Sequence, residues 1–76
     1  MSRELDVRDL APPERHPKIH DAFDALDSGE ALTLINDHDP KPLFYELQAE
    51  REDFDARNYE VEKRGPGEFV ATLPKV

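Results

Sequence analysis

The chain has 76 residues, no cysteine, and 18 acidic against 10 basic side chains, which gives a formal net charge of −8 at pH 7. This length predicts one domain over residues 1–76, and the lack of cysteine excludes disulfides, thiolate metal sites and cysteine nucleophiles. The acidic balance argues against nucleic acid as a partner, because carboxylates repel the phosphate backbone.

The composition and the N-terminus indicate where such a protein works. Dense surface carboxylates are typical of proteins from salt-loving organisms, in which molar salt screens the repulsion between them. We therefore expect a halophilic source. Residues 1–10 lack the apolar stretch of a signal peptide, and no segment approaches the roughly 18 apolar residues of a membrane span. We expect a cytoplasmic protein without a membrane partner.

The first half of the chain is predicted to form a strand, a helix and a second strand. Apolar and charged residues alternate over 5–8, which predicts a short half-buried strand. From Glu14 apolar residues recur every three or four positions, which predicts a helix that Gly29 ends in a left-handed conformation. Pro17 fits this helix only within its first turn. The compact apolar run over 31–36 predicts a central strand.

The second half is predicted to form a helix and a closing hairpin. Helical spacing over 43–51 predicts a second amphipathic helix, and alternation over 59–62 and 69–73 predicts two antiparallel strands. The order β-α-β-α-β-β begins with a right-handed β-α-β unit. The predicted fold class is α/β (α+β), a two-layer sandwich in which two helices cover one face of a four-stranded mixed sheet.

The other face of this sheet is expected to be open. Ile35, Val70 and Thr72 are predicted to point toward it. An uncovered face with apolar side chains favours coverage by a protein partner or by a second copy of the chain in a homodimer. The sequence leaves both occupants open.

Polar residues gather where the two strand-to-helix connections are predicted to meet. Loops that leave parallel strands lie at the same edge of a sheet, so we expect one polar crevice there. Free N–H groups at the two helix N-termini would favour a small anionic or polar ligand, or a protein partner. The candidate binding residues are Arg15, His16, Asp37, His38, Asp39 and Lys41.

A divalent metal is a second interpretation of the same crevice. His16, His38 and a carboxylate from Asp37 or Asp39 make a two-histidine, one-carboxylate set of the kind that holds iron or zinc. His20 lies one helical turn beyond His16 and is a further candidate ligand, although it would point away from the helix start. The three histidines lack the fixed spacing of a strong zinc signature.

A structural interpretation explains these residues without a ligand. Asp39 suits the N-cap of a helix that starts with proline, and Asn36 or Asp37 would cap the end of the preceding strand. His16 would hydrogen-bond this loop and fasten it to the first helix. Arg15 would pair with Asp37 or Asp39, an ion pair that contributes little if it is exposed.

Short motifs resemble the SirA/TusA-like sulfur-carrier superfamily over nearly the whole chain. Residues 5–10 (LDVRDL) resemble its opening strand, residues 29–30 (GE) match the G-E before its second strand, and residues 39–40 (DP) match the D-P that opens its second helix. Where that superfamily has C-P-x-P, residues 12–15 read PPER. The resemblance therefore implies the fold but excludes sulfur transfer through a cysteine persulfide.

The chain resembles more specifically the cysteine-less branch known as domain of unknown function family 2249. That branch has R-H-P early in helix one and N-D-H-D-P-x-P-L after strand two, which occur here at 15–17 and 36–43. Domains of the branch are sometimes joined to hemerythrin-like or other metal-binding domains, which implies a redox or metal setting.

The sequence favours a binding or adaptor domain over an enzyme. No serine or threonine has an adjacent histidine–acid arrangement, and there is no glycine-rich phosphate loop. The leading hypothesis is a non-enzymatic domain that uses the polar crevice. The alternative is a metal- or haem-linked accessory protein in redox metabolism that uses His16 and His38.

Overall fold

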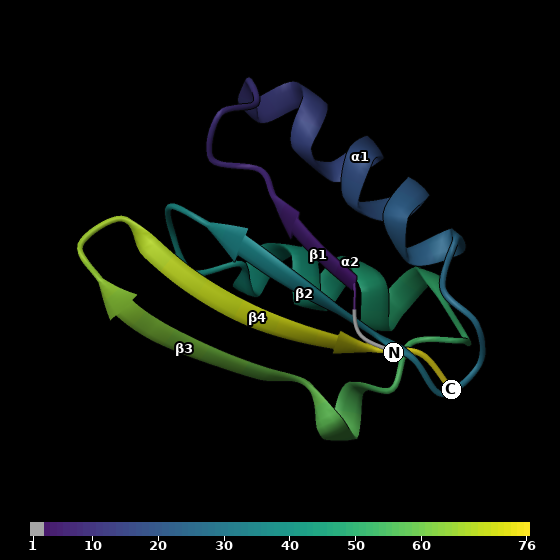
Figure 1. The fold of residues 1–76 in the computed structure, drawn as a ribbon. Coiled ribbons are helices and arrows are strands. Elements are labelled where there is room, and N and C mark those ends of the chain that lie inside the picture. Colours follow the sequence, from purple (N-terminus) through teal and green to yellow (C-terminus); the bar gives the residue numbers. More distant parts are fainter. Residues whose placement is uncertain (1–2) are drawn as a thin grey trace.

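The computed structural model describes residues 3–76 and confirms the predicted order of the main elements (Figure 1). The elements in chain order are β1 (Arg3–Asp6), α1 (Pro12–Asp24), β2 (Ala31–Asn36), α2 (Lys41–Glu50), a short 3-10 helix η1 (Ala56–Asn58), β3 (Glu60–Gly65) and β4 (Glu68–Pro74). Only η1 was not expected from the sequence. None of the helices in this part of the chain is long and apolar enough to cross a membrane.

The strands form one mixed sheet in the order β1-β2-β4-β3. β1 and β2 are parallel, as a β-α-β unit requires, whereas β4 runs antiparallel to both of its neighbours, β2 and β3. The last strand of the chain therefore lies inside the sheet, and β1 and β3 form its two edges. The predicted four-stranded mixed sheet is confirmed.

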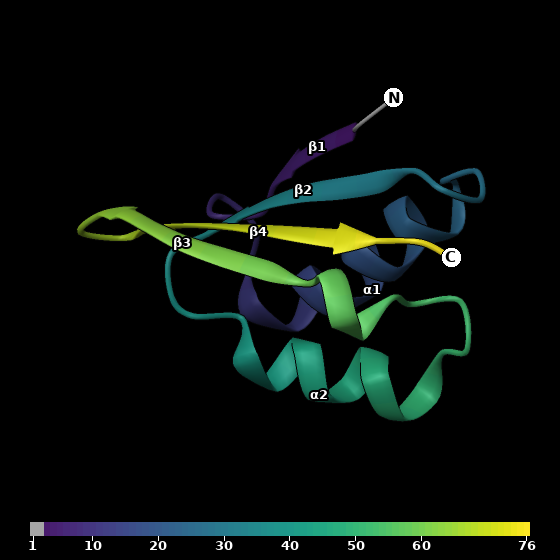
Figure 2. The same cartoon turned by 90° about the horizontal axis from the view of Figure 1, so that it is seen from below.

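Both helices lie on one side of the sheet, so the molecule has two layers and one uncovered sheet face (Figure 2). Burial alternates along β2, because successive side chains of a strand point to opposite faces. The core lies between the two layers, and its largest fully buried side chains are Phe23, Ile19, Leu32, Leu34, Leu43, Leu47, Leu73 and Val7.

The first helix begins earlier than predicted because of its prolines. α1 starts at Pro12 rather than at Glu14, since the first positions of a helix need no N–H donor. Pro17 therefore lies in the second turn and not in the first. Its missing N–H leaves the carbonyl of Pro13 without the usual helical bond. Gly29 has φ +87°, which confirms the predicted left-handed residue.

The predicted N-cap of the second helix is wrong. α2 begins at Lys41, and Pro40 rather than Asp39 holds the N-cap position, without a side-chain cap. An N-cap side chain at Asp39 would bond the N–H two or three residues onward. Pro42, three positions on, has no N–H to donate, so only the N–H of Lys41 remains for such a cap.

Candidate functional site

Arg15 joins the two loops at the carboxyl edge of the parallel strands. Its side chain projects from α1 and is buried, with 8% of the residue exposed. In the loop after β1 it donates from Nε to the Leu10 carbonyl at 3.0 Å and from Nη2 to the Arg8 carbonyl at 3.2 Å. In the loop after β2, Nη1 donates to Asn36 Oδ1 at 3.0 Å and to Asp37 Oδ1 at 2.7 Å, and Nη2 to Asp37 Oδ2 at 3.1 Å. All five donors of the guanidinium are thus used.

Asp37 is the acceptor at the centre of this network. Both of its carboxylate oxygens bond Arg15, and Oδ1 also lies 2.8 Å from His38 Nδ1. The Arg15 bonds, and after them the His38 bond, hold the pKa of Asp37 far below its usual range. The Asp37 backbone N–H donates to Asn36 Oδ1 at 2.8 Å, so the buried Asn36 closes the strand end as predicted.

His38 is oriented by Asp37 and open to solvent. An ionised carboxylate only accepts, so Nδ1 carries the proton in this hydrogen bond. In the neutral ring Nε2 is then the acceptor. The side chain is 63% exposed, which leaves the imidazole available to another molecule. The predicted pairing of Arg15 with Asp37 is confirmed, and through Asp37 this pair holds the imidazole of the exposed His38 in place.

His16 lies against the second helix and not against the loop. Its Nδ1 is 2.7 Å from Glu46 Oε2, and His20 Nε2 is 3.5 Å from the other oxygen of the same carboxylate. Burial raises the pKa of Glu46, but the contacts with the two imidazoles outweigh it, so the net shift of the pKa is downward. The prediction that His16 fastens the loop is wrong, because its partner is Glu46. His16 and Glu46 instead join α1 to α2.

The expected metal ligands are not brought together. Among residues 3–76 no group of three or more His, Cys, Asp or Glu side chains is arranged to hold a metal ion. His16 and His38 contact different carboxylates, Glu46 and Asp37. The fold therefore does not bring His16 together with His38 and Asp37, because α1 turns His16 toward Glu46 in the middle of α2.

The helix N-termini at this edge offer few free donors. Pro12 and Pro13 supply no N–H at the start of α1, and the next N–H, of Glu14, bonds the Ala11 carbonyl at 2.9 Å. Pro40 and Pro42 likewise remove donors around the start of α2. What this edge presents to solvent is side chains, namely His38, Asp39 and Lys41, all of which are exposed.

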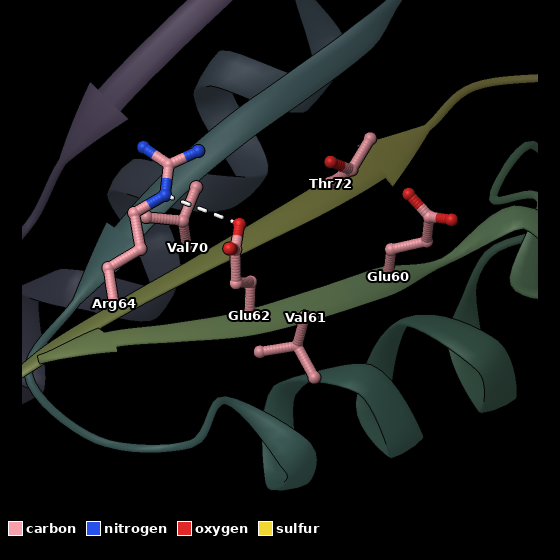
Figure 3. A pocket seen from close by; sticks show the side chains of 6 residues that line it. All are labelled: Glu60, Val61, Glu62, Arg64, Val70 and Thr72. Atoms are coloured by element: carbon pink, nitrogen blue, oxygen red, sulfur yellow. Dashed lines mark hydrogen bonds and ion pairs between the residues drawn. The ribbon is translucent and has the colours of Figure 1, made fainter.

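A second feature of the surface was not predicted from the sequence. A hollow of about 440 Å³ lies over β3 and β4 (Figure 3). Four of its side chains, from Glu60, Glu62, Val70 and Thr72, stand on the open face, whereas Val61 points toward the helices. The sequence feature that could have indicated this hollow is the alternation of Glu60 and Glu62, because it places carboxylates on β3 beside Thr72 and Val70 of β4.

The fold defines a small two-layer α/β domain. Its polar edge lies where the two strand-to-helix loops meet, and prolines stand at the start of both helices there. The chain belongs to the family of uncharacterized conserved proteins DUF2249, whose model matches residues 4–75. This match includes both segments that carried the resemblance, at 15–17 and 36–43. No match to the chain is found among the curated proteins or among the solved structures.

Proposed function

We propose that this domain is a non-enzymatic binding or adaptor module that recognises a partner protein through the loop surface, which consists of His38, Asp39 and Lys41. The loop surface combines an imidazole, a carboxylate and an ammonium, all exposed at one edge. Groups of this kind make directed hydrogen bonds, which select a partner more than they add raw affinity.

The Arg15 network is the observation that carries the proposal. Burial of a guanidinium costs desolvation energy, and a buried ion pair is often replaceable by apolar residues without loss of stability. Here the network holds Asp37, and Asp37 orients the exposed imidazole of His38. We infer that the network is retained to position His38, since closing the corner alone would not require it. Arg15 and Asp37 are then positioning residues.

The broader setting is also part of the proposal. Similarity of motifs and of element order supports descent from a SirA/TusA-like sulfur carrier, and the cysteine-free chain has no thiol for that chemistry. The acidic composition supports a cytoplasmic protein of a salt-loving organism. In such a cell the partner must tolerate high salt, which favours short, directed contacts over long-range charge attraction.

Quantitative affinity capture from a lysate of the source organism tests the proposal. The wild-type domain is compared with His38→Ala, Asp37→Asn and the control Glu14→Gln, which changes an exposed side chain on α1. We expect at least one protein that wild type and control retain equally, and that His38→Ala loses by about tenfold or more. Asp37→Asn should weaken the same interaction less, because it frees the imidazole without removing it.

Reconstitution with the purified captured protein completes this experiment. The direct affinity should follow the same order of variants. If His38→Ala and wild type capture the same proteins in the same amounts, the loop surface is not the binding site and the proposal fails.

A further inference from the structure

Carboxylates border the open face of the sheet on both edges. One transverse row of paired residues runs from β1 to β3 as Asp6, Ile35, Val70 and Glu62. The register therefore places two apolar side chains between two acids. Val70 is only 7% exposed, and it lies outside the core cluster.

The neighbouring row repeats this arrangement. It runs from β1 to β3 as Glu4, Thr33, Thr72 and Glu60. Uncharged side chains again occupy the two inner strands, and acids again occupy the two edges. Over these two rows the open face is therefore a trough with uncharged side chains on β2 and β4 and a carboxylate rim on each side, and Arg64 of β3 also lines the hollow there (Figure 3).

The two rows differ in the partners of their acids. Asp6 pairs with Arg8 at 2.7 Å and Glu62 with Arg64 at 3.3 Å. Glu4 and Glu60 are exposed and form no ion pair with any residue between 3 and 76. The Arg64–Glu62 pair is 55% and 68% exposed on its two side chains, so a cation from another molecule could replace Arg64 at small cost.

The trough matches the dimensions of an α-helix. Three strand spacings separate the two rims by roughly 14 Å, because neighbouring strands lie about 4.8 Å apart. A helix with its side chains is about 10–12 Å wide, so its flanks would reach both rims. Residues two apart on a strand are separated by about 7 Å, close to the roughly 5.4 Å of one helical turn. Cations one turn apart on a helix would therefore meet successive acids on a rim.

We propose that the open face of the sheet docks a basic amphipathic helix of a partner protein. The apolar stripe of that helix lies over Ile35 and Val70, and its flanking Lys or Arg side chains pair with the rims at Glu4 and Glu60. This surface is distinct from the loop surface, so the two proposals stand or fall separately. With both, the domain holds two partners at once, as an adaptor does.

Charge selects this occupant over a second copy of the chain. Each molecule carries a formal charge of −8, and a face-to-face homodimer would bring acidic rims together. Like charges across an interface disfavour association. A basic helix instead neutralises the rims and covers the trough.

Binding of a synthetic peptide tests the proposal. The probe is a helical peptide of about 16 residues, roughly 24 Å long, with a leucine stripe flanked by lysines; the control peptide has glutamate in place of lysine. The molecule measures 31 × 23 × 23 Å, so the probe can span the face. Fluorescence anisotropy gives the affinity, and NMR shifts locate the site. We expect shifts at Thr33, Ile35, Val70 and Thr72, and no binding of the glutamate peptide.

Variants make the assignment specific. The double variant Glu4→Gln with Glu60→Gln should lower the affinity for the lysine peptide by about tenfold. It should also reduce the salt dependence of that affinity, as expected when charges at the edge of an interface are removed. The matched control, Glu14→Gln with Glu52→Gln, removes the same charge from exposed positions elsewhere and should change the affinity less than about twofold. Arg64→Gln should strengthen binding, because it removes the competing cation. His38→Ala should leave it unchanged.

Several outcomes overturn the inference. Equal weakening by the two double variants would mean non-specific attraction to an acidic protein. Shifts confined to the helix face, or no binding of the lysine peptide, would show that the trough is not a helix site. Sedimentation that reveals a homodimer abolished by substitutions at Ile35 would assign the face to a second copy.

Discussion

Tyr59 carries a hydroxyl that the fold leaves without a partner. The oxygen is buried and bonds no atom of residues 3–76. Burial, and after it the charge of Asp39, raises the pKa of Tyr59 to about 12. Its ring packs on Phe44, with centroids 4.4 Å apart, and edge-on to Phe54. The ring thus stabilises the fold while the hydroxyl opposes it.

Tyr59→Phe should therefore stabilise the protein. It keeps the ring contacts and removes an unsatisfied polar group, so we expect the free energy of unfolding to rise by about 1 kcal/mol. Urea denaturation measures the change. Tyr45→Phe is the control, because Tyr45 is 57% exposed and its hydroxyl is solvated. A loss of stability in Tyr59→Phe would show that the hydroxyl is bonded in solution.

Asp37 makes a contribution to stability that acid removes. The pKa of Asp37 in the folded protein lies far below its unfolded value of about 4. A depressed pKa contributes stability that is complete above the unfolded pKa and is lost as the pH falls through the folded pKa. We expect the stability difference between wild type and Asp37→Asn to be constant above about pH 5 and to shrink steadily below about pH 4.

Urea denaturation from pH 7 down to the acid limit of the fold, in molar KCl, measures this difference. The salt suppresses the opposing effect, in which protonation relieves repulsion among the many acids. Asp21→Asn is the matched control on an exposed helix position. Parallel curves for wild type and Asp37→Asn would contradict the role given to the Arg15 pair.

At the scale of single residues, the sequence predicted that Arg15 pairs with an acid of the second loop, but it did not predict that Arg15 is buried. The Arg15–Asp37 pair was one of two pairs expected, but its burial depends on how α1 docks over both loops, which no local pattern reports. His16 was expected at the loop because, like Arg15, it lies near the start of α1, at the edge where the two loops meet. Consecutive residues on a helix point about 100° apart, and His16 accordingly faces Glu46.

The end of α1 is stabilised by a residue far away in the sequence. The last turn of α1 contains no basic residue. Lys75, just after β4, donates from Nζ to the carbonyls of Phe23, Asp24 and Leu26 at 3.3, 3.4 and 2.9 Å. The Phe23 and Asp24 carbonyls belong to the last turn of α1, where carbonyls lack the usual helical N–H partner, and the Phe23 carbonyl also accepts from the Leu26 N–H at 3.1 Å. A cation at this end also interacts favourably with the helix dipole. The ammonium lies 5.5 Å from the Phe23 ring centroid as well.

Lys75→Met should cost about 1–3 kcal/mol of unfolding free energy, since it keeps most of the side-chain volume and removes the charged donor. Hydrogen exchange should show faster opening of the α1 C-terminus in this variant. Lys18→Met, on the exposed side of α1, is the control and should change stability by less than about 0.5 kcal/mol. Equal effects of the two substitutions would contradict a capping role for Lys75.

Elements whose signals are local were predicted well. The order of strands and helices followed from apolar periodicity, and Gly29 from its place after a helix. The ends of elements were less predictable, because prolines shift the first residues of α1 and α2 and because Lys75 acts across the fold. The open face was predicted, but its two acidic rims follow from strand register, which the sequence alone does not fix.

For the whole molecule, the balance between a small core and a large charge sets stability. The buried cluster of 11 apolar residues must hold together a chain whose formal charge is −8. Exposed carboxylates repel one another in dilute buffer. Salt shortens the distance over which this repulsion acts, from about 10 Å at 0.1 M to about 3 Å at 1 M. We therefore expect the urea midpoint to rise strongly between 0.1 M and 2 M KCl.

Charge screening must be separated from the general effect of salt on apolar burial. The triple variant Glu14→Gln, Asp21→Asn and Glu52→Gln removes three exposed charges and changes the formal charge from −8 to −5. If repulsion limits stability, the variant should be more stable than wild type at 0.1 M KCl and nearly equal to it at 2 M. A difference that stays the same at both concentrations would assign the salt effect to apolar burial, and the halophilic interpretation of the composition would lose its physical basis.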